Sequence, residues 1–147
     1  MAPSQHQYLR LVIGGSTFLL PSVMRYTIEQ RDALSENTAS QSPVAAWRTV
    51  RGTRWPAYSL GPDLATRPAG DWHRAVFLEA RPQNVGIIVD EVQLLPRGET
   101  EIAKFTPLGP APTRFGHLFD GAWVSGRDVT LVFEPTALIG YLQSLGE

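Results

Sequence analysis

The sequence predicts a mainly β protein that ends in a short helix. Three observations support this. Short strand-like runs recur along the 147 residues, glycine- or proline-containing turns separate them at close spacing, and only one segment, near the C-terminus, has a helical pattern. We count about ten such strands, an arrangement that favours antiparallel barrels or a sandwich.

In the first half, the strands come in two pairs. Residues 8–13 and 17–20 flank Gly14-Gly15, and residues 47–50 and 54–58 flank Arg51-Gly52-Thr53, so each pair predicts a hairpin. Pro56 cannot donate a hydrogen bond and predicts an edge position or a bulge for its strand. Residues 22–30 are ambiguous between helix and strand. Residues 31–42 are polar and predict a mobile loop, and residues 62–64 could form one helical turn.

The second half begins with a strand at residues 75–78. Val85-Gly86-Ile87-Ile88-Val89 follows, an unbroken apolar run that predicts a strand buried on both faces. Strands are also expected at 92–95, 119–124 and 129–133, and proline-rich residues 106–113 predict an irregular crossing. Residues 134–142 predict a helix, because Pro135 suits its first turn and Leu138 and Leu142 share a face. Residues 47–64 and 123–138 resemble each other weakly, as two related barrels would.

Composition limits the kinds of function that fit. Hydrophobic residues make up 43% of the chain, which suffices for a core, and the net charge of −1 gives no footprint for nucleic acid or for an anionic membrane. Cysteine is absent. Residues 1–7 lack the basic start of a secretory signal, and no apolar run is long enough to span a membrane. We therefore expect a cytoplasmic protein with no membrane insertion.

Two motifs in this order resemble the CheW-like domain, the adaptor of bacterial chemotaxis signalling. Residues 50–60, Val-Arg-Gly-Thr-Arg-Trp-Pro-Ala-Tyr-Ser-Leu, are similar to the family's Arg-Gly turn, its proline and its Asp-Leu ending. Residues 85–92, Val-Gly-Ile-Ile-Val-Asp-Glu-Val, are similar to its Gly-apolar-apolar-Val-Asp-x-Val. The hairpin at 9–20 and the segment 121–142 also fit, so the resemblance covers almost the whole chain.

The chain departs from the family pattern at four positions. Ala46 and Thr49 stand where the family usually has Gly and Asn, and Ser59 replaces the Asp of the Asp-Leu ending. Thr27 stands where an acidic residue often pairs with the Arg-Gly arginine, with Glu29 nearby. These departures mark a divergent member.

The resemblance implies one CheW-like domain spanning residues 1–147, built as two five-stranded SH3-like barrels that exchange chain segments and share an apolar interface. It also implies a non-enzymatic adaptor that couples the regulatory domain of a CheA-type histidine kinase to the cytoplasmic tip of a methyl-accepting receptor. An auxiliary adaptor of a pilus-motility or similar pathway, without direct receptor binding, is the alternative.

The candidate partner-binding residues come from the two motifs. In the first motif Gly52 permits a tight turn and Arg51 would orient a groove between the barrels, whereas the plainer interpretation is a hairpin turn with a solvated arginine. Aromatic side chains are common both in interfaces and in barrel cores. The complete candidate set is Val50, Arg51, Gly52, Arg54, Trp55, Pro56, Asn84 and Val85.

Reactive groups form no recognisable constellation, so we expect no catalytic, cofactor or metal site. Asp90 and Glu91 are adjacent on a strand, point to opposite faces, and cannot flank one bond. The histidines His6, His73 and His117 lack the spacing of metal ligands, and Ser16 and Ser59 lie in no nucleophile motif.

Two other classes of function stay open. Arg48, Arg51 and Arg54 cluster with two tryptophans, as in a small nucleic-acid-binding barrel, although the net acidity argues against it. A hydrolase or ligand-binding enzyme would need a triad, a metal set or a phosphate loop, and none is recognisable.

Overall fold

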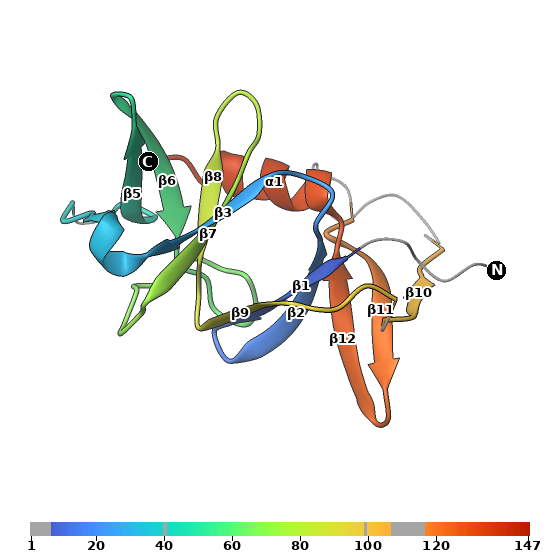
Figure 1. The fold of residues 1–147 in the computed structure, drawn as a ribbon. Helices are drawn as coiled ribbons and strands as arrows, with labels where there is room; N and C mark the ends of the chain where they lie inside the picture. Colours follow the sequence, from blue (N-terminus) through green and yellow to red (C-terminus); the bar gives the residue numbers. More distant parts are fainter. Residues whose placement is uncertain (1–6, 40, 99, 107–116) are drawn as a thin grey trace.

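The protein was analysed as a computed structural model, which describes residues 7–39, 41–98, 100–106 and 117–147. Twelve strands form two six-stranded sheets in this part of the chain, and one α-helix lies near the C-terminus (Figure 1). The predicted mainly β fold with a terminal helix is confirmed. Each sheet has six strands instead of five, because the very short strands β4 and β10 each add to one edge.

The first sheet, sheet A, combines the two ends of the chain. Its strand order is β10-β11-β12-β2-β1-β9, and all neighbours are antiparallel except β12 and β2. Its strands are β1 (Tyr8–Ile13), β2 (Ser16–Pro21), β9 (Glu91–Leu94), β10 (Ile102–Lys104), β11 (Phe119–Ser125) and β12 (Asp128–Phe133).

The second sheet, sheet B, is built from the middle of the chain. Its order is β3-β7-β8-β6-β5-β4, and β6 and β8 are its one parallel pair. Its strands are β3 (Tyr26–Gln30), β4 (Ser35–Glu36), β5 (Val44–Val50), β6 (Thr53–Tyr58), β7 (Arg74–Leu78) and β8 (Val85–Val89). The chain thus leaves sheet A after β2 and returns to it at β9.

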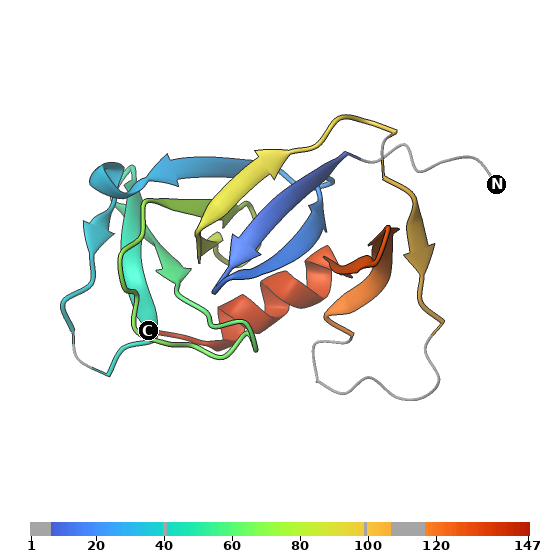
Figure 2. The ribbon, with the colours of Figure 1, turned by 90° about the horizontal axis from the view of Figure 1, so that it is seen from below.

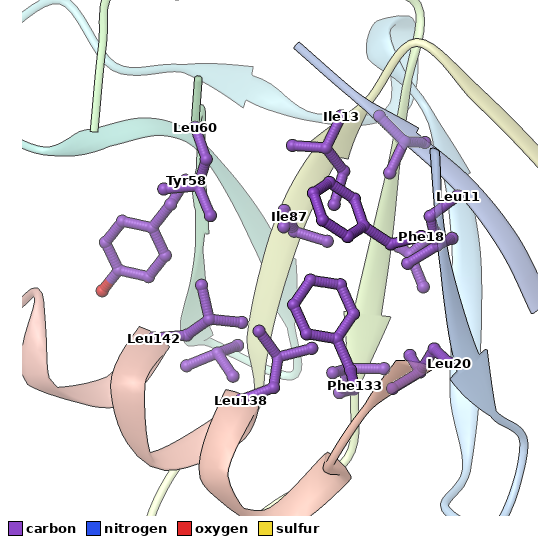
Figure 3. Packing of buried hydrophobic residues seen from close by; sticks show 14 of the residues in the cluster. Leu11, Ile13, Phe18, Leu20, Tyr58, Leu60, Ile87, Phe133, Leu138 and Leu142 are labelled. Carbon is purple, nitrogen blue, oxygen red and sulfur yellow. The ribbon is translucent and has the colours of Figure 1, made fainter. Parts of the chain in front are cut away.

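A central apolar layer lies between the sheets. Alternate residues of β1 and β8 enter it, as the two-residue period of a strand requires. Sheet A contributes Leu9, Leu11 and Ile13, and sheet B contributes Ile87 and Val89 among others; ten side chains of the cluster are labelled in Figure 3. Because one cluster includes side chains of both sheets, the predicted shared apolar interface is confirmed.

The alternate residues that point away from the central layer form two smaller clusters, one on the opposite face of each sheet. Tyr8, Leu19 and Val132 cluster on sheet A. Ala75, Phe77 and Ile88 belong to the corresponding cluster of sheet B. All five residues of β8 are consequently buried, which confirms the strand predicted to be buried on both faces.

The helix α1 (Pro135–Ser144) closes one side of the central layer, opposite strands β3 and β9 (Figure 2). Pro135 occupies the first turn, as expected, and the Glu134 side chain caps the helix by accepting a hydrogen bond from the Ala137 N–H at 2.6 Å. Leu138 and Leu142 are fully buried. The apolar face of α1 is therefore a wall of the core.

Several local predictions need correction. Residues 22–30 contain the strand β3, and the polar segment 31–42 contains a 3₁₀ turn, η1 (Arg31–Ala33), and β4 instead of a mobile loop alone. Residues 62–64 form a turn and no helix. The side chain of Arg31 holds this region together, because it bonds to Glu36 and donates to the Trp72 carbonyl at 3.1 Å. Residues 107–113 of the predicted crossing lie outside the described residues.

Pro56 was expected at an edge or a bulge, but β6 lies between β5 and β8. Two features make the missing N–H tolerable. The β6–β8 pairing begins only at Ala57. Counting from the two-residue turn that pairs Val50 with Thr53, the pair of Pro56 and Trp47 falls at a non-hydrogen-bonded position of the β5–β6 ladder.

No helix within the described residues is long and apolar enough to cross a membrane.

Candidate partner-binding site

The two motifs meet at one end of sheet B. Strands β6 and β8 are parallel, so both begin at the same end, and β7 ends there because it is antiparallel to β8. The Arg51-Gly52 turn precedes β6, and Asn84 precedes β8. Both loops project in the same direction in Figure 1. We call this region the loop end of sheet B: the β5–β6 turn, the β7–β8 loop and the residues leading into β3.

The β5–β6 turn has two central residues in the left-handed region, with φ of 52° at Arg51 and 81° at Gly52. This is the pattern of a type I′ turn, in which Asn-Gly is the favoured pair. Arg51 is exposed and makes no ion pair with any described residue. The chain therefore holds an arginine at a position where its backbone conformation is costly.

Three candidate residues lie on β6 beside this turn. The Arg54 guanidinium lies over the Trp47 ring, 4.1 Å from its centroid. Trp55 is half-buried and packs against the outer cluster of sheet B. Pro56 is buried. Arg54 is the most accessible of the three side chains.

Asn84 and Val85 differ in accessibility although they are neighbours. The Asn84 side chain is half-buried, and its Oδ1 accepts a hydrogen bond from the Ala80 N–H at 3.0 Å, which shapes the β7–β8 loop. Val85 has an exposed fraction of 0% and belongs to the central layer. In this conformation Val85 and Pro56 offer no side-chain surface to a partner, so the accessible candidates are Val50, Arg51, Gly52, Arg54, Trp55 and Asn84.

A hollow of about 190 Å³ opens at the loop end. Phe77 is one of its lining residues, and the ring lies against Gly86, where a Cβ would come within 2.7 Å of it. The Arg48 guanidinium lies 5.9 Å from the centroid of the same ring. The full lining is Arg25, Thr27, Arg48, Phe77, Glu79 and Asn84.

One ion pair fixes the wall of this hollow. Arg48 Nε lies 3.1 Å from Glu29 Oε1, and both side chains are about three-quarters buried. Thr27 at the usual acidic position left a salt bridge to Arg51 in doubt; in the structure Glu29 pairs with Arg48, and Thr27 is exposed. From the sequence, Arg48 was a candidate only for a nucleic-acid-binding face. Its partner Glu29 lies on β3, which is not next to β5 in the strand order of sheet B, and no local pattern encodes this contact.

The edge strands β3 and β9 carry exposed aliphatic side chains, and we call this region the apolar opening. Ile28 on β3 and Leu94 on β9 are 40% and 44% exposed. On the neighbouring strands, Ile28 is paired with Val76 and Leu94 with Leu9, and both partners belong to the central layer. On the same edge strands, Tyr26 and Val92 pack against that layer. The central layer therefore reaches the surface along the edge strands β3 and β9, on the side away from α1 (Figure 2).

The acidic pair Asp90-Glu91 has structural partners. Asp90 Oδ2 accepts a hydrogen bond from the Gly15 N–H at 3.0 Å, and Glu91 lies 3.3 Å from Arg10. The two carboxylates thus bind different parts of the β1–β2 hairpin. No group of three or more His, Asp or Glu side chains in the described residues has a geometry that could hold a metal ion.

The groups with shifted pKa values are tyrosines that anchor the C-terminal segment. Burial, followed by the charge of Glu147, raises the pKa of Tyr58 to about 12, and burial followed by Asp63 raises that of Tyr141. Tyr58 donates a hydrogen bond to the Gly146 carbonyl at 2.8 Å. Tyr141 donates to the Leu64 carbonyl at 2.5 Å. A raised pKa keeps each hydroxyl protonated and able to donate.

A larger hollow of about 540 Å³ lies elsewhere, on an open polar surface that includes Arg31, Asn37, Arg67 and Trp72. Arg31 is already held there by Glu36 and the Trp72 carbonyl. This surface contains none of the candidate residues.

No protein-family model matches the sequence, and no curated protein matches it either. Among solved structures, the scaffolding protein TtCheW from Thermoanaerobacter tengcongensis is similar, with a TM-score of 0.60 and 17% sequence identity. The match covers 89% of this chain and 90% of that one. The fold is CheW-like. At this identity, the match establishes the CheW-like fold alone, and it bears out the resemblance drawn from the two motifs.

Proposed function

We propose that residues 1–147 act as one CheW-like domain, a non-enzymatic adaptor that binds the regulatory domain of a CheA-type histidine kinase and the cytoplasmic tip of a methyl-accepting receptor. The observation that carries this proposal is the extent of the structural match, 89% of this chain and 90% of a scaffolding protein. Coverage so nearly complete in both directions leaves little of either chain outside the shared fold.

The surfaces described above support the proposal. The opening along β3 and β9 offers aliphatic side chains to the apolar face of a receptor helix, and the loop end of sheet B offers charged and polar ones. An adaptor that binds both partners couples them thermodynamically. If receptor binding changes the adaptor's affinity for the kinase by some factor, kinase binding changes its affinity for the receptor by the same factor.

The test is a binding measurement with purified proteins. Isothermal titration of the chain with its cognate kinase regulatory domain should give a dissociation constant of about 1–100 μM, the range of a transient contact. The receptor tip should bind as well, and prior saturation with it should change the kinase affinity. Failure to bind the kinase domain at about 1 mM would refute the proposal.

One observation favours the auxiliary adaptor as second candidate. The chain departs from the family pattern at Thr27, Ala46, Thr49 and Ser59, and its Glu29 pairs with Arg48 instead of Arg51. The same titrations separate the two candidates. Kinase binding together with receptor binding supports the coupling adaptor, whereas kinase binding alone supports the auxiliary one.

A further inference from the structure

The charges at the loop end of sheet B are unbalanced. Arg25, Arg51 and Arg81 are exposed there, and none forms an ion pair with a described residue. The carboxylates near them are Glu79, which lines the hollow, and Glu29, which Arg48 engages. Four arginines thus face two glutamates, in a chain whose net charge is −1. The loop end is a basic pole on a slightly acidic protein.

The basic pole contains the hollow of about 190 Å³ described above. Arg25 and Arg48 both line it, together with Thr27, Phe77, Glu79 and Asn84. Glu29 holds Arg48 through Nε, and no bond to a described residue engages the terminal nitrogens of that guanidinium. A volume of about 190 Å³ equals roughly six water molecules, which is room for the end of one side chain.

We propose that this hollow receives a carboxylate side chain of a protein partner, with Arg25 and Arg48 as its recognition groups and Arg51 and Arg81 as the surrounding positive field. Guanidinium groups bind carboxylates through paired, charge-assisted hydrogen bonds. The inference deepens the proposed function, since it states the chemistry that the partner must present at the loop end: an acidic residue that projects from a folded surface.

The aromatic side chains argue for a protein partner over a nucleic acid. A single-stranded nucleic acid would need exposed rings on which bases stack. Trp47 is only 7% exposed and is covered by Arg54, and Trp55 is half-buried. Arg54 also shares a neighbouring hollow with the acidic Glu147. The pole therefore presents guanidinium groups without a stacking surface.

The experiment uses a poly-glutamate peptide as probe, followed by backbone NMR shifts of the labelled full chain. The shifts should concentrate on the residues that line the hollow, and poly-lysine should produce none. Raising the salt from about 0.01 M to about 0.15 M shortens the Debye length from about 30 Å to about 8 Å, and the affinity should fall accordingly. Shifts scattered over the surface, or unaffected by salt, would overturn the inference.

Two variants test the residues. Arg25→Gln should weaken peptide binding about two- to fivefold, the range for one exposed charge contact. Arg74→Gln is the matched control, because Arg74 is also exposed and lies on β7 at the opposite end of sheet B. Equal affinities for wild type and Arg25→Gln, or an equal loss in Arg74→Gln, would contradict the proposal. Tighter binding of a single-stranded oligonucleotide at the same residues would replace it with a nucleic-acid site.

Repeating the variants with the kinase domain and the receptor tip separates this inference from the proposed function. If the peptide binds at the hollow but neither protein binds, the carboxylate site stands and the adaptor proposal fails. If either protein binds with an affinity insensitive to salt and to Arg25→Gln, the adaptor proposal stands and the carboxylate site fails.

Discussion

Gly86 shows why the second sequence motif contains a glycine at this position. A Cβ there would lie 2.7 Å from the ring of Phe77, which is one of the residues that line the hollow. Gly86→Ala should therefore destabilise the fold by about 1–3 kcal/mol, the usual cost of overpacking. Urea unfolding measures this. Gly70→Ala is the control, since a Cβ at Gly70 would meet no atom within 4 Å; equal stability losses in both variants would contradict the steric explanation.

Replacing Arg51 should affect the stability of the fold and the binding of a partner in different ways. The φ of 52° at Arg51 strains an arginine, and asparagine is favoured at the same position of a type I′ turn. Arg51→Asn should hold or raise the free energy of unfolding, by up to about 1 kcal/mol, while weakening the association with the receptor tip. The two readouts are thermal unfolding and titration. A loss of stability together with unchanged binding would show that Arg51 is structural.

The raised pKa of Tyr58 predicts that the free energy of unfolding depends on pH in the alkaline range. This pKa is raised from 10.0 to about 12, first by burial and then by the charge of Glu147. Between these two values the unfolded state has lost the proton that the folded state keeps, so the free energy of unfolding falls as the pH rises through this window. Urea unfolding at several pH values should show the decline. Tyr58→Phe should flatten it, and an equally steep decline in that variant would assign the effect to other groups.

The helix α1 is an element whose packing and boundaries the sequence predicts well. Leu138 is fully buried in the central layer (Figure 3), so Leu138→Ala should cost about 2–5 kcal/mol of unfolding free energy. Thr136→Ala changes an exposed position of the same helix and should stay within about 0.5 kcal/mol. Comparable losses in the two variants would contradict burial as the cause, because alanine has the highest helix propensity and neither change lowers it.

Strands were predictable wherever the apolar pattern was long enough. The five-residue β8 was predicted with its observed bounds, because five apolar or glycine residues stand between turn signals. The two-residue β4 and three-residue β10 have no such pattern, and their pairing comes from neighbouring strands. Arg51 and Asn84, one from each motif, lie at the same end of sheet B, and their role in binding a partner stays a prediction. The burial of Val85 and Pro56 depends on how neighbouring strands and the two sheets pack together, so the sequence of a single strand does not reveal it.

At the scale of the whole molecule, the missed features are long-range ones. The Glu29–Arg48 pair joins β3 to β5, which are far apart in the strand order of sheet B. The exchange of chain segments between the sheets likewise depends on which strands meet, although the weak similarity of residues 47–64 and 123–138 indicated two related halves. Local patterns determine the elements, whereas the ion pairs and the hollow arise from their assembly.

Because one apolar layer includes side chains of both sheets, and the chain passes from sheet A to sheet B and back, neither sheet should be stable alone. We predict one cooperative unfolding transition. Three tryptophans, Trp47, Trp55 and Trp72, lie in or against sheet B, and Trp123 lies in sheet A. Fluorescence of Trp123→Phe then reports on sheet B, while far-UV circular dichroism of the same sample reports on all strands. Coincident urea midpoints are expected; a separate earlier or later transition in the fluorescence would show that the sheets are independent units, and the single-domain proposal would fail.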